Sequence, residues 1–255
     1  MEWSEAVYNA LQLFREEAPL EALQLETILP YWDVTNLNEA ATETDIQATL
    51  NKTQINGVCA AAICVYPRFV PFVKRLLLDA PLRVATVVNF PNGNASLQAV
   101  GLQIEQTIAD GADEIDVVFP YHAFLQHEYD FCSEFVSYCK SLCGDSLLKV
   151  ILETGMLSDP ALIVQAATLS ALAGADFIKT STGKVSVGAT LDSVAAILLA
   201  IDAVKKDCAQ TVGLKVSGGI KTVQEATKYY RLAALLMGEA WMVSRHFRVG
   251  ASVLA

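Results

Sequence analysis

The sequence predicts an α/β fold, a closed (β/α)8 barrel (TIM barrel) with an extra N-terminal helix, from three observations. Short apolar runs, typical of buried parallel strands, alternate with helical segments along the chain. The length of 255 residues fits one such barrel, which usually takes about 250 residues. The hydrophobic content of 53% fits strands that are covered on both faces. A doubly wound open sheet is the alternative that the same alternation allows.

Eight segments have the character of buried strands. They are residues 31–34, 58–66, 83–89, 114–119, 147–153, 176–180, 212–216 and 234–237. Pro30 comes just before the first segment, where its missing N–H is tolerated. Eight strands in a chain of this length favour the closed barrel over the open sheet.

Helical segments lie between these strands, most clearly at 96–110, 129–142, 160–173 and 191–206. Asp159 followed by Pro160 indicates a helix N-cap with proline in the first turn. Gly111 and Gly174 indicate helix ends, and each is followed by a similar strand segment, which suggests a repeated unit.

The first 25 residues predict an amphipathic helical extension. Ala6, Ala10, Leu13 and Phe14 supply an apolar face, which we expect to cap the barrel or to pack at an oligomer contact. No linker or low-complexity stretch interrupts the chain, so we expect a single domain over residues 1–255.

Charge and composition exclude several classes of partner. The net charge of −10 argues against nucleic-acid binding. We find no apolar stretch near the roughly 20 residues of a membrane span, and the acidic N-terminus does not resemble a secretory signal. The six cysteines form no CxxC pair and the three histidines are scattered, so we expect reduced thiols and no metal site. These features favour a cytoplasmic protein without a membrane partner.

Two lysines at the ends of predicted strands are the main chemical signal. Lys179 follows Phe177 and Ile178, and Lys215 follows Leu214. Burying an ammonium is costly, so stability alone does not explain these positions. A lysine in a dry site, or beside a second cation, loses its proton near neutral pH and can form an imine with a carbonyl. The pair therefore predicts a nucleophile and a neighbour that tunes it, although a single strand-end lysine could equally be an ion-pair partner.

Other polar residues interrupt nearly every predicted strand near its end. They are Asp33, Cys64, Asn89, Asp116, Lys149, Glu153 and Thr182. The functional groups of a (β/α)8 barrel lie at this end of the strands, and charges that share one small volume must be paired. Plainer interpretations remain for some of them, since Cys64 could be a small core side chain and Asp33 a strand-end cap.

Eight segments together resemble the deoxyribose-phosphate aldolases, class I enzymes that cleave 2-deoxy-D-ribose 5-phosphate to glyceraldehyde 3-phosphate and acetaldehyde. The segments are 31–38, 61–70, 84–94, 111–121, 147–155, 174–184, 212–222 and 247–252. The most specific are GADFIKTSTGK and VGLKVSGG, which contain Lys179 and Lys215.

The resemblance implies that Lys179 is the Schiff-base nucleophile and that Lys215 keeps it deprotonated by like-charge repulsion. It implies that Asp116 moves protons through an ordered water. It matches Asp33 and Lys149 with partners of Lys215, and we also expect Thr182 and Cys64 around the site.

The resemblance also implies a phosphate cradle of backbone N–H groups and one ammonium, formed by Gly183, Lys184, Gly218 and Gly219. Gly218 and Gly219 could instead form only a tight turn. The family commonly has two consecutive serines as further phosphate donors. Ser252 and Val253 stand at this place here, so we expect both to lie at the phosphate, with one hydroxyl donor fewer. Well-studied members continue into a tail with a terminal tyrosine implicated in proton transfer, and this sequence ends at Ala255.

We therefore expect a metal-free and cofactor-free aldolase that forms a covalent lysine imine with its substrate. Its partners would be phosphosugar and aldehyde substrates, and the chain could form a homodimer. Another Schiff-base barrel lyase or a transaldolase is one alternative, which would lack this spacing of Lys179, Lys215 and Asp116. A non-catalytic phosphosugar-binding barrel is another, with no need of a desolvated Lys179.

Overall fold

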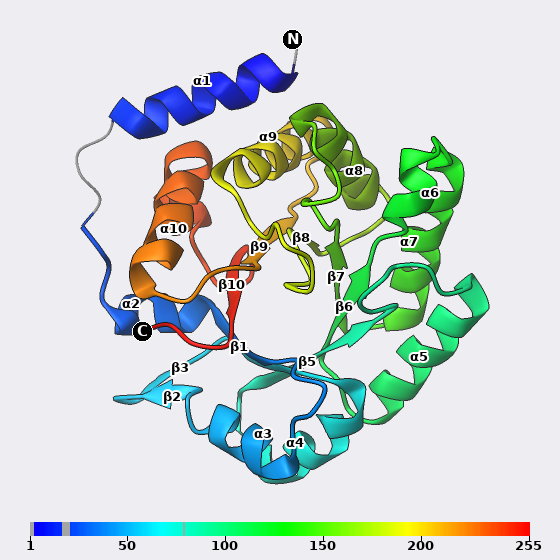
Figure 1. Ribbon diagram of the computed structural model, residues 1–255, viewed down its shortest axis with the longest axis vertical. Helices are drawn as coiled ribbons and strands as arrows, with labels where there is room; N and C mark the ends of the chain where they lie inside the picture. Colours follow the sequence, from blue (N-terminus) through cyan, green and yellow to red (C-terminus); the bar gives the residue numbers. More distant parts are fainter. Residues whose placement is uncertain (1–2, 17–20, 79) are drawn as a thin grey trace.

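The computed structural model describes residues 3–16, 21–78 and 80–255. Its centre is a closed barrel of eight parallel strands in the order β1-β10-β9-β8-β7-β6-β5-β4 (Figure 1). The strands are β1 (Trp32–Asn36), β4 (Ala62–Val65), β5 (Arg83–Val88), β6 (Glu114–Val118), β7 (Leu147–Ile151), β8 (Phe177–Lys179), β9 (Gly213–Ser217) and β10 (Phe247–Ala251). Because β1 pairs with both β4 and β10, the sheet has no free edge, which confirms the barrel and excludes the open sheet.

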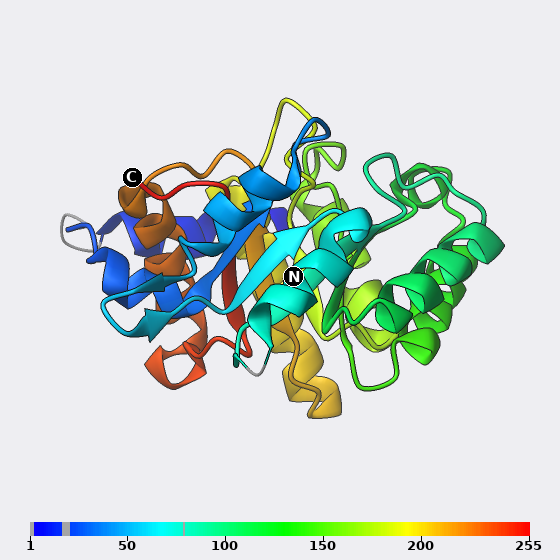
Figure 2. The same ribbon diagram turned by 90° about the horizontal axis from the view of Figure 1, so that it is seen from below.

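Helices form a ring around the barrel (Figures 1 and 2). The longer ones are α3 (Glu43–Leu50), α4 (Val70–Leu77), α5 (Leu97–Ala109), α7 (Tyr129–Cys143), α8 (Pro160–Leu172), α9 (Leu191–Cys208) and α10 (Val223–Met237), and the shorter ones are α2 (Leu25–Ile28) and α6 (Tyr121–Leu125). The predicted start of α8 is confirmed, since the Asp159 side chain accepts a hydrogen bond from the Ala161 N–H. Gly111 and Gly174 have φ of +101° and +103°, as expected just after a helix end.

Helix α1 (Trp3–Glu16) lies outside the ring and packs against α8 and α9 (Figure 1). It buries Val7, Leu11 and Phe14 together with Ala10, which follow the i, i+4, i+7 spacing of one helical face. Leu13 is 57% exposed, so its predicted place on the packed face was wrong. Of the predicted extension, residues 1–2 and 17–20 lie outside the described residues.

The predicted eighth strand, residues 234–237, was wrong. This segment is the last turn of α10, which begins at the capping box of Thr222 and Glu225. A continuous apolar run is equally compatible with a helix that packs on the barrel, so the pattern could not separate the two. The eighth strand is β10, Phe247–Ala251, in which Arg248 and Gly250 interrupt the apolar residues.

The predicted strand 58–66 was only partly right, because the chain divides it. Val58 and Cys59 form β3 (Val58–Cys59), which pairs with β2 (Gln54–Ile55) as a small antiparallel hairpin outside the barrel. Asn56 and Gly57 both have positive φ, the conformation of a tight hairpin turn, and Ala62 then begins β4.

This architecture brings the carboxyl ends of the strands to one side of the barrel. Figure 2 shows the loops that follow β1 and β8 rising on that same side. No helix in the described part of the chain is both long and apolar enough for a membrane crossing.

Candidate active site

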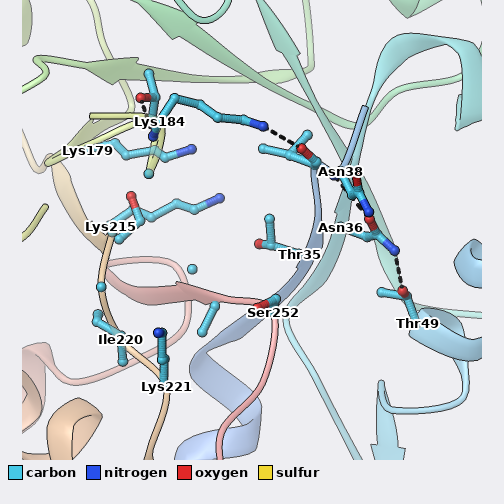
Figure 3. A pocket seen from close by; sticks show the side chains of 18 of the residues that line it. Thr35, Asn36, Asn38, Thr49, Lys179, Lys184, Lys215, Ile220, Lys221 and Ser252 are labelled. Carbon is cyan, nitrogen blue, oxygen red and sulfur yellow. Dashed lines mark hydrogen bonds between the residues drawn. The ribbon is translucent and has the colours of Figure 1, made fainter. Parts of the chain in front are cut away.

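The two lysines lie side by side on neighbouring strands. Lys179 ends β8 and is paired in register with Lys215 on β9. Both side chains point into the same cavity (Figure 3), and they are 3% and 1% exposed. Gly250 on β10 makes room for this arrangement, since a Cβ there would lie 3.0 Å from Cε of Lys215. The sheet register therefore places two amines together in a nearly dry site.

Asp116, on β6, lies beneath both amines and is fully buried. Its Oδ2 atom is 2.7 Å from Nζ of Lys179 and 2.8 Å from Nζ of Lys215. Its other oxygen, Oδ1, is 2.8 Å from Nζ of Lys149, the residue paired with Asp116 in the β6–β7 register. One carboxylate thus joins three lysines.

A second layer of buried charges supports this group. Asp33 on β1 places Oδ2 2.6 Å from Nζ of Lys215, and its Oδ1 is 2.7 Å from the Arg248 guanidinium. Arg248 also contacts Glu114 at 3.1 Å, and Glu114 lies 2.5 Å from Nζ of Lys149. Buried charges of this kind are tolerated only when each is paired, and here every carboxylate contacts at least two cations.

The three buried lysines have pKa values shifted in different directions by their surroundings. Burial and the positive charge of Lys215 lower the pKa of Lys179, despite the opposing effect of Asp116. Burial would also lower the pKa of Lys215, but Asp116 and Asp33 raise it well above its ordinary value. The pKa of Lys149 is likewise raised, because Asp116 and Glu114 outweigh burial. Lys179 is the lysine of this group most easily obtained as a free amine.

The carboxylates complement this pattern. Burial would raise the pKa of Asp116, but Lys149, Lys179 and Lys215 hold it well below its ordinary value. Asp33 behaves in the same way, with Lys215 and Arg248 lowering its pKa. Both carboxylates are therefore ionised at neutral pH.

A charge count for this network points to the same amine. In the described part of the chain it contains three buried carboxylates (Asp33, Glu114 and Asp116) and four buried nitrogen groups (Lys149, Lys179, Lys215 and Arg248). Arg83 approaches Glu114 only at 3.9 Å and is 52% exposed, so water screens its charge. This network alone carries no net charge when one of its four nitrogen groups is uncharged. Of these four groups, Lys179 is the one whose pKa is lowered, whereas the pKa values of Lys149, Lys215 and Arg248 are raised.

A cavity of about 540 Å³ opens above the amines. Eight of the residues predicted for the site line it, namely Lys179, Lys215, Thr182, Gly183, Lys184, Gly218, Gly219 and Ser252. Asp116, Asp33, Lys149 and Cys64 are fully buried below the lining. Val253 is 41% exposed and does not line the cavity.

All of the predicted phosphate residues except Val253 line this cavity. Gly218 has φ of +93°, a conformation that side chains disfavour, and a Cβ there would come within 2.9 Å of Gly188. Lys184 reaches across the opening, where its ammonium donates a hydrogen bond of 2.8 Å to the Leu37 carbonyl (Figure 3). The described residues contain no group of three or more His, Cys, Asp or Glu side chains that could hold a metal ion.

Sequence reasoning missed Glu114 and Arg248 as members of the buried network. Glu114 stands two positions before Asp116, and residues two apart on a strand face the same side, so the alternation could have indicated it. Arg248 was missed because the eighth strand was placed at the wrong segment. The paired positions of Arg248 and Lys215 follow only from the observed register of β9 and β10.

Comparison with known families identifies the chain. The sequence model of the DeoC/LacD family aldolases matches residues 27–252, which include every strand of the barrel. The chain belongs to this aldolase family.

Similar solved structures include two proteins provisionally named as deoxyribose-phosphate aldolases. One, from Coccidioides immitis, is 27% identical to this aldolase with a TM-score of 0.80, over 98% of this chain and 93% of the other. The second, from Toxoplasma gondii ME49, is 25% identical with a TM-score of 0.79, over 96% and 92% of the two chains. A tetrameric deoxyribose phosphate aldolase from Aeropyrum pernix is 23% identical with a TM-score of 0.69, over 98% and 93%, and shares the fold.

Proposed function

We propose that this aldolase reversibly cleaves 2-deoxy-D-ribose 5-phosphate to D-glyceraldehyde 3-phosphate and acetaldehyde through an imine on Lys179. The observation that carries the proposal is the pairing of a low-pKa Lys179 with a cationic Lys215 above one shared oxygen of Asp116. An amine nucleophile needs a neutral nitrogen at working pH, and a desolvated lysine beside a second cation supplies it.

In the proposed reaction, the neutral Nζ of Lys179 attacks the C1 aldehyde of the open-chain sugar. Loss of water gives an iminium, which draws electrons away from the C2–C3 bond. Asp116, acting with a water molecule, accepts the proton of the C3 hydroxyl, and the C2–C3 electron pair moves into the iminium to form an enamine. Asp116 suits this role because it is held ionised beside the reacting nitrogen.

Release of glyceraldehyde 3-phosphate leaves the enamine on Lys179. Protonation of its terminal carbon and hydrolysis of the resulting iminium release acetaldehyde and restore the amine. Lys215 contributes throughout by disfavouring the protonated form of free Lys179. No step of this sequence requires a metal or an organic cofactor.

The 5-phosphate would bind at the cavity mouth. Gly183, Lys184, Gly218 and Gly219 lie there beside Ser252, and their backbone N–H groups and one ammonium suit a dianion. In this structure the Lys184 ammonium donates a hydrogen bond to the Leu37 carbonyl. To bind phosphate, the ammonium would have to donate to the phosphate as well as to Leu37, or in place of it.

The test is product analysis with the purified protein and 2-deoxyribose 5-phosphate in the presence of EDTA, followed by proton and phosphorus NMR. We expect acetaldehyde and glyceraldehyde 3-phosphate in equal amounts, and neither product with Lys179→Leu. Cleavage of fructose 1,6-bisphosphate without cleavage of the deoxy sugar would show that this family member acts on a different phosphosugar.

A further inference from the structure

Glu153 is a buried carboxylate that the proposed chemistry does not use. It follows β7, has no exposed surface, and makes no ion pair among the described residues. Its φ is +54°, a left-handed conformation that is costly for a residue with a side chain and persists only where its surroundings enforce it. The backbone on both sides is fixed to the end of β8, through hydrogen bonds from Leu152 to Lys179 and from Thr154 to Thr180.

The Glu153 side chain receives hydrogen bonds from the loop that follows Lys179. The Ser181 hydroxyl donates to Oε1 at 2.6 Å, and the Thr182 hydroxyl donates to Oε2. The backbone N–H of Thr182 also points to the same carboxylate, at 3.3 Å. Donors of this kind satisfy a buried carboxylate in the absence of a paired cation.

The same two hydroxyls also shape the loop. The Ser181 oxygen accepts the N–H of Gly183 at 3.1 Å, and the Thr182 oxygen accepts the N–H of Lys184 at 3.0 Å. Residues 181–184 therefore contain two successive ST-turns, in each of which a hydroxyl oxygen accepts the backbone N–H two residues further along. Because each hydroxyl has one hydrogen and directs it to Glu153, its lone pairs are free to accept the backbone groups.

We propose that Glu153 is a positioning residue for phosphate binding, which acts through Ser181 and Thr182 to hold the turn of Gly183 and Lys184. The proposal rests on the proposed function, since that function gives the turn its phosphate. Thr182, Gly183 and Lys184 line the cavity whereas Glu153 does not, so Glu153 affects the ligand only through the turn.

The charge of Glu153 and its positioning role predict opposite changes in phosphate affinity when Glu153 is replaced. Removing a carboxylate from the neighbourhood of a phosphate dianion reduces repulsion and should strengthen phosphate binding. Replacing one of the two acceptor oxygens by an amide nitrogen leaves one of the two hydroxyls without its acceptor. Phosphate binding should then weaken, because the turn loses part of the geometry that places its N–H groups. The sign of the change in phosphate affinity therefore separates the two effects.

The experiment compares Glu153→Gln with the parent and with Asp159→Asn. The control makes the same carboxylate-to-amide change in the same β7–α8 connection, at an exposed helix N-cap where asparagine serves equally well. Five quantities are measured for each protein: the Kd for inorganic phosphate, kcat and KM for deoxyribose 5-phosphate, and kcat and KM for unphosphorylated 2-deoxyribose. The thermal unfolding midpoint is recorded alongside.

For Glu153→Gln we expect the phosphate Kd and the KM for the phosphorylated sugar to rise about tenfold, the loss typical of one hydrogen bond to a charged group. The kcat/KM for 2-deoxyribose should stay within about twofold, and Asp159→Asn should match the parent throughout. Thr182→Val should show the same loss of phosphate affinity, and Thr182→Ser should retain most of the affinity. This pair of variants also tests the proposal if Glu153→Gln does not fold.

An unchanged or lower phosphate Kd in Glu153→Gln, or an equal loss with both sugars, would overturn the proposal. If the parent cleaves neither sugar, the proposed function fails, while the phosphate Kd values still test Glu153 separately.

Discussion

Nζ of Lys179 lies 2.7 Å from Oδ2 of Asp116, and this is its only ion pair in the described part of the chain. Lys215, one strand away, contacts both Asp116 and Asp33. Lys149, one strand away on the other side, is paired with three carboxylates. Lys179 therefore has the least compensation for its burial, which explains why its pKa is lowered while those of its neighbours are raised.

Lys215→Leu should move the acid limb of the pH–rate profile to higher pH. Activity needs neutral Lys179, and loss of the neighbouring cation removes a charge that lowers its pKa. The pKa of Lys179 should rise, so activity should be strongly reduced near neutral pH and should recover as the pH is raised. The measurement is kcat/KM against pH, with Lys228→Leu on the surface of α10 as a control for loss of one positive charge. A pH–rate profile that matches that of the parent would show that Lys215 does not lower the pKa of Lys179.

Asp116→Asn should allow imine formation but block the steps that move protons. The substitution removes the carboxylate that raises the pKa of Lys179, so the amine stays neutral to lower pH. Exchange of acetaldehyde methyl protons with deuterated water, followed by NMR, should fall by about 100-fold or more. Exchange at the parent rate would mean that another group transfers the proton.

Arg248→Met should destabilise the barrel by about 3–5 kcal/mol, because Asp33 and Glu114 then remain buried without their guanidinium. Arg83→Met is the matched control, since Arg83 approaches the same Glu114 but is half-exposed, and its loss should cost under about 1 kcal/mol. Denaturant unfolding measures both values. Equal losses would show that burial of Arg248 does not determine its contribution.

Ser252→Ala should weaken selection of the phosphorylated sugar more than Val253→Ala does. Ser252 lines the cavity, whereas Val253 is 41% exposed outside the lining. A hydrogen bond to a charged group is worth about 1.5–3 kcal/mol, so kcat/KM for deoxyribose 5-phosphate should fall about tenfold or more in Ser252→Ala. Values for 2-deoxyribose should change little in either variant. A larger effect of Val253→Ala, or a gain on Val253→Ser, would place residue 253 against the phosphate.

The sequence indicated those parts of the fold that depend on local pattern. Seven barrel strands and four of the helices between them, α5, α7, α8 and α9, were located, because buried strands, caps and helix-ending glycines leave short-range signals. The prediction of the eighth strand was wrong, because Leu232–Met237 forms an apolar run that only its packing identifies as helical. The hairpin at Asn56 and Gly57 had a local signal, the Asn-Gly dipeptide, which was overlooked.

The candidate site shows the same division. Lys179 and Lys215 were found as charges at the ends of apolar runs, and their neighbours lie on the strands that the pattern located. Arg248 and Glu153 depend on long-range geometry: one on the β9–β10 register, the other on hydrogen bonds between the ends of β7 and β8. Nor could the sequence predict that Asp33, on the first strand, faces Arg248 on the last.

The most direct measurement for the central claim is borohydride reduction in the presence of acetaldehyde, with the modified residue located by peptide mass spectrometry. If Lys179 forms the imine, one ethyl group should be found on Lys179, and none in Lys179→Leu, which should fold normally because an apolar side chain suits the end of β8. An adduct on Lys215 or Lys184 in place of Lys179, or no adduct at all, would contradict the central claim.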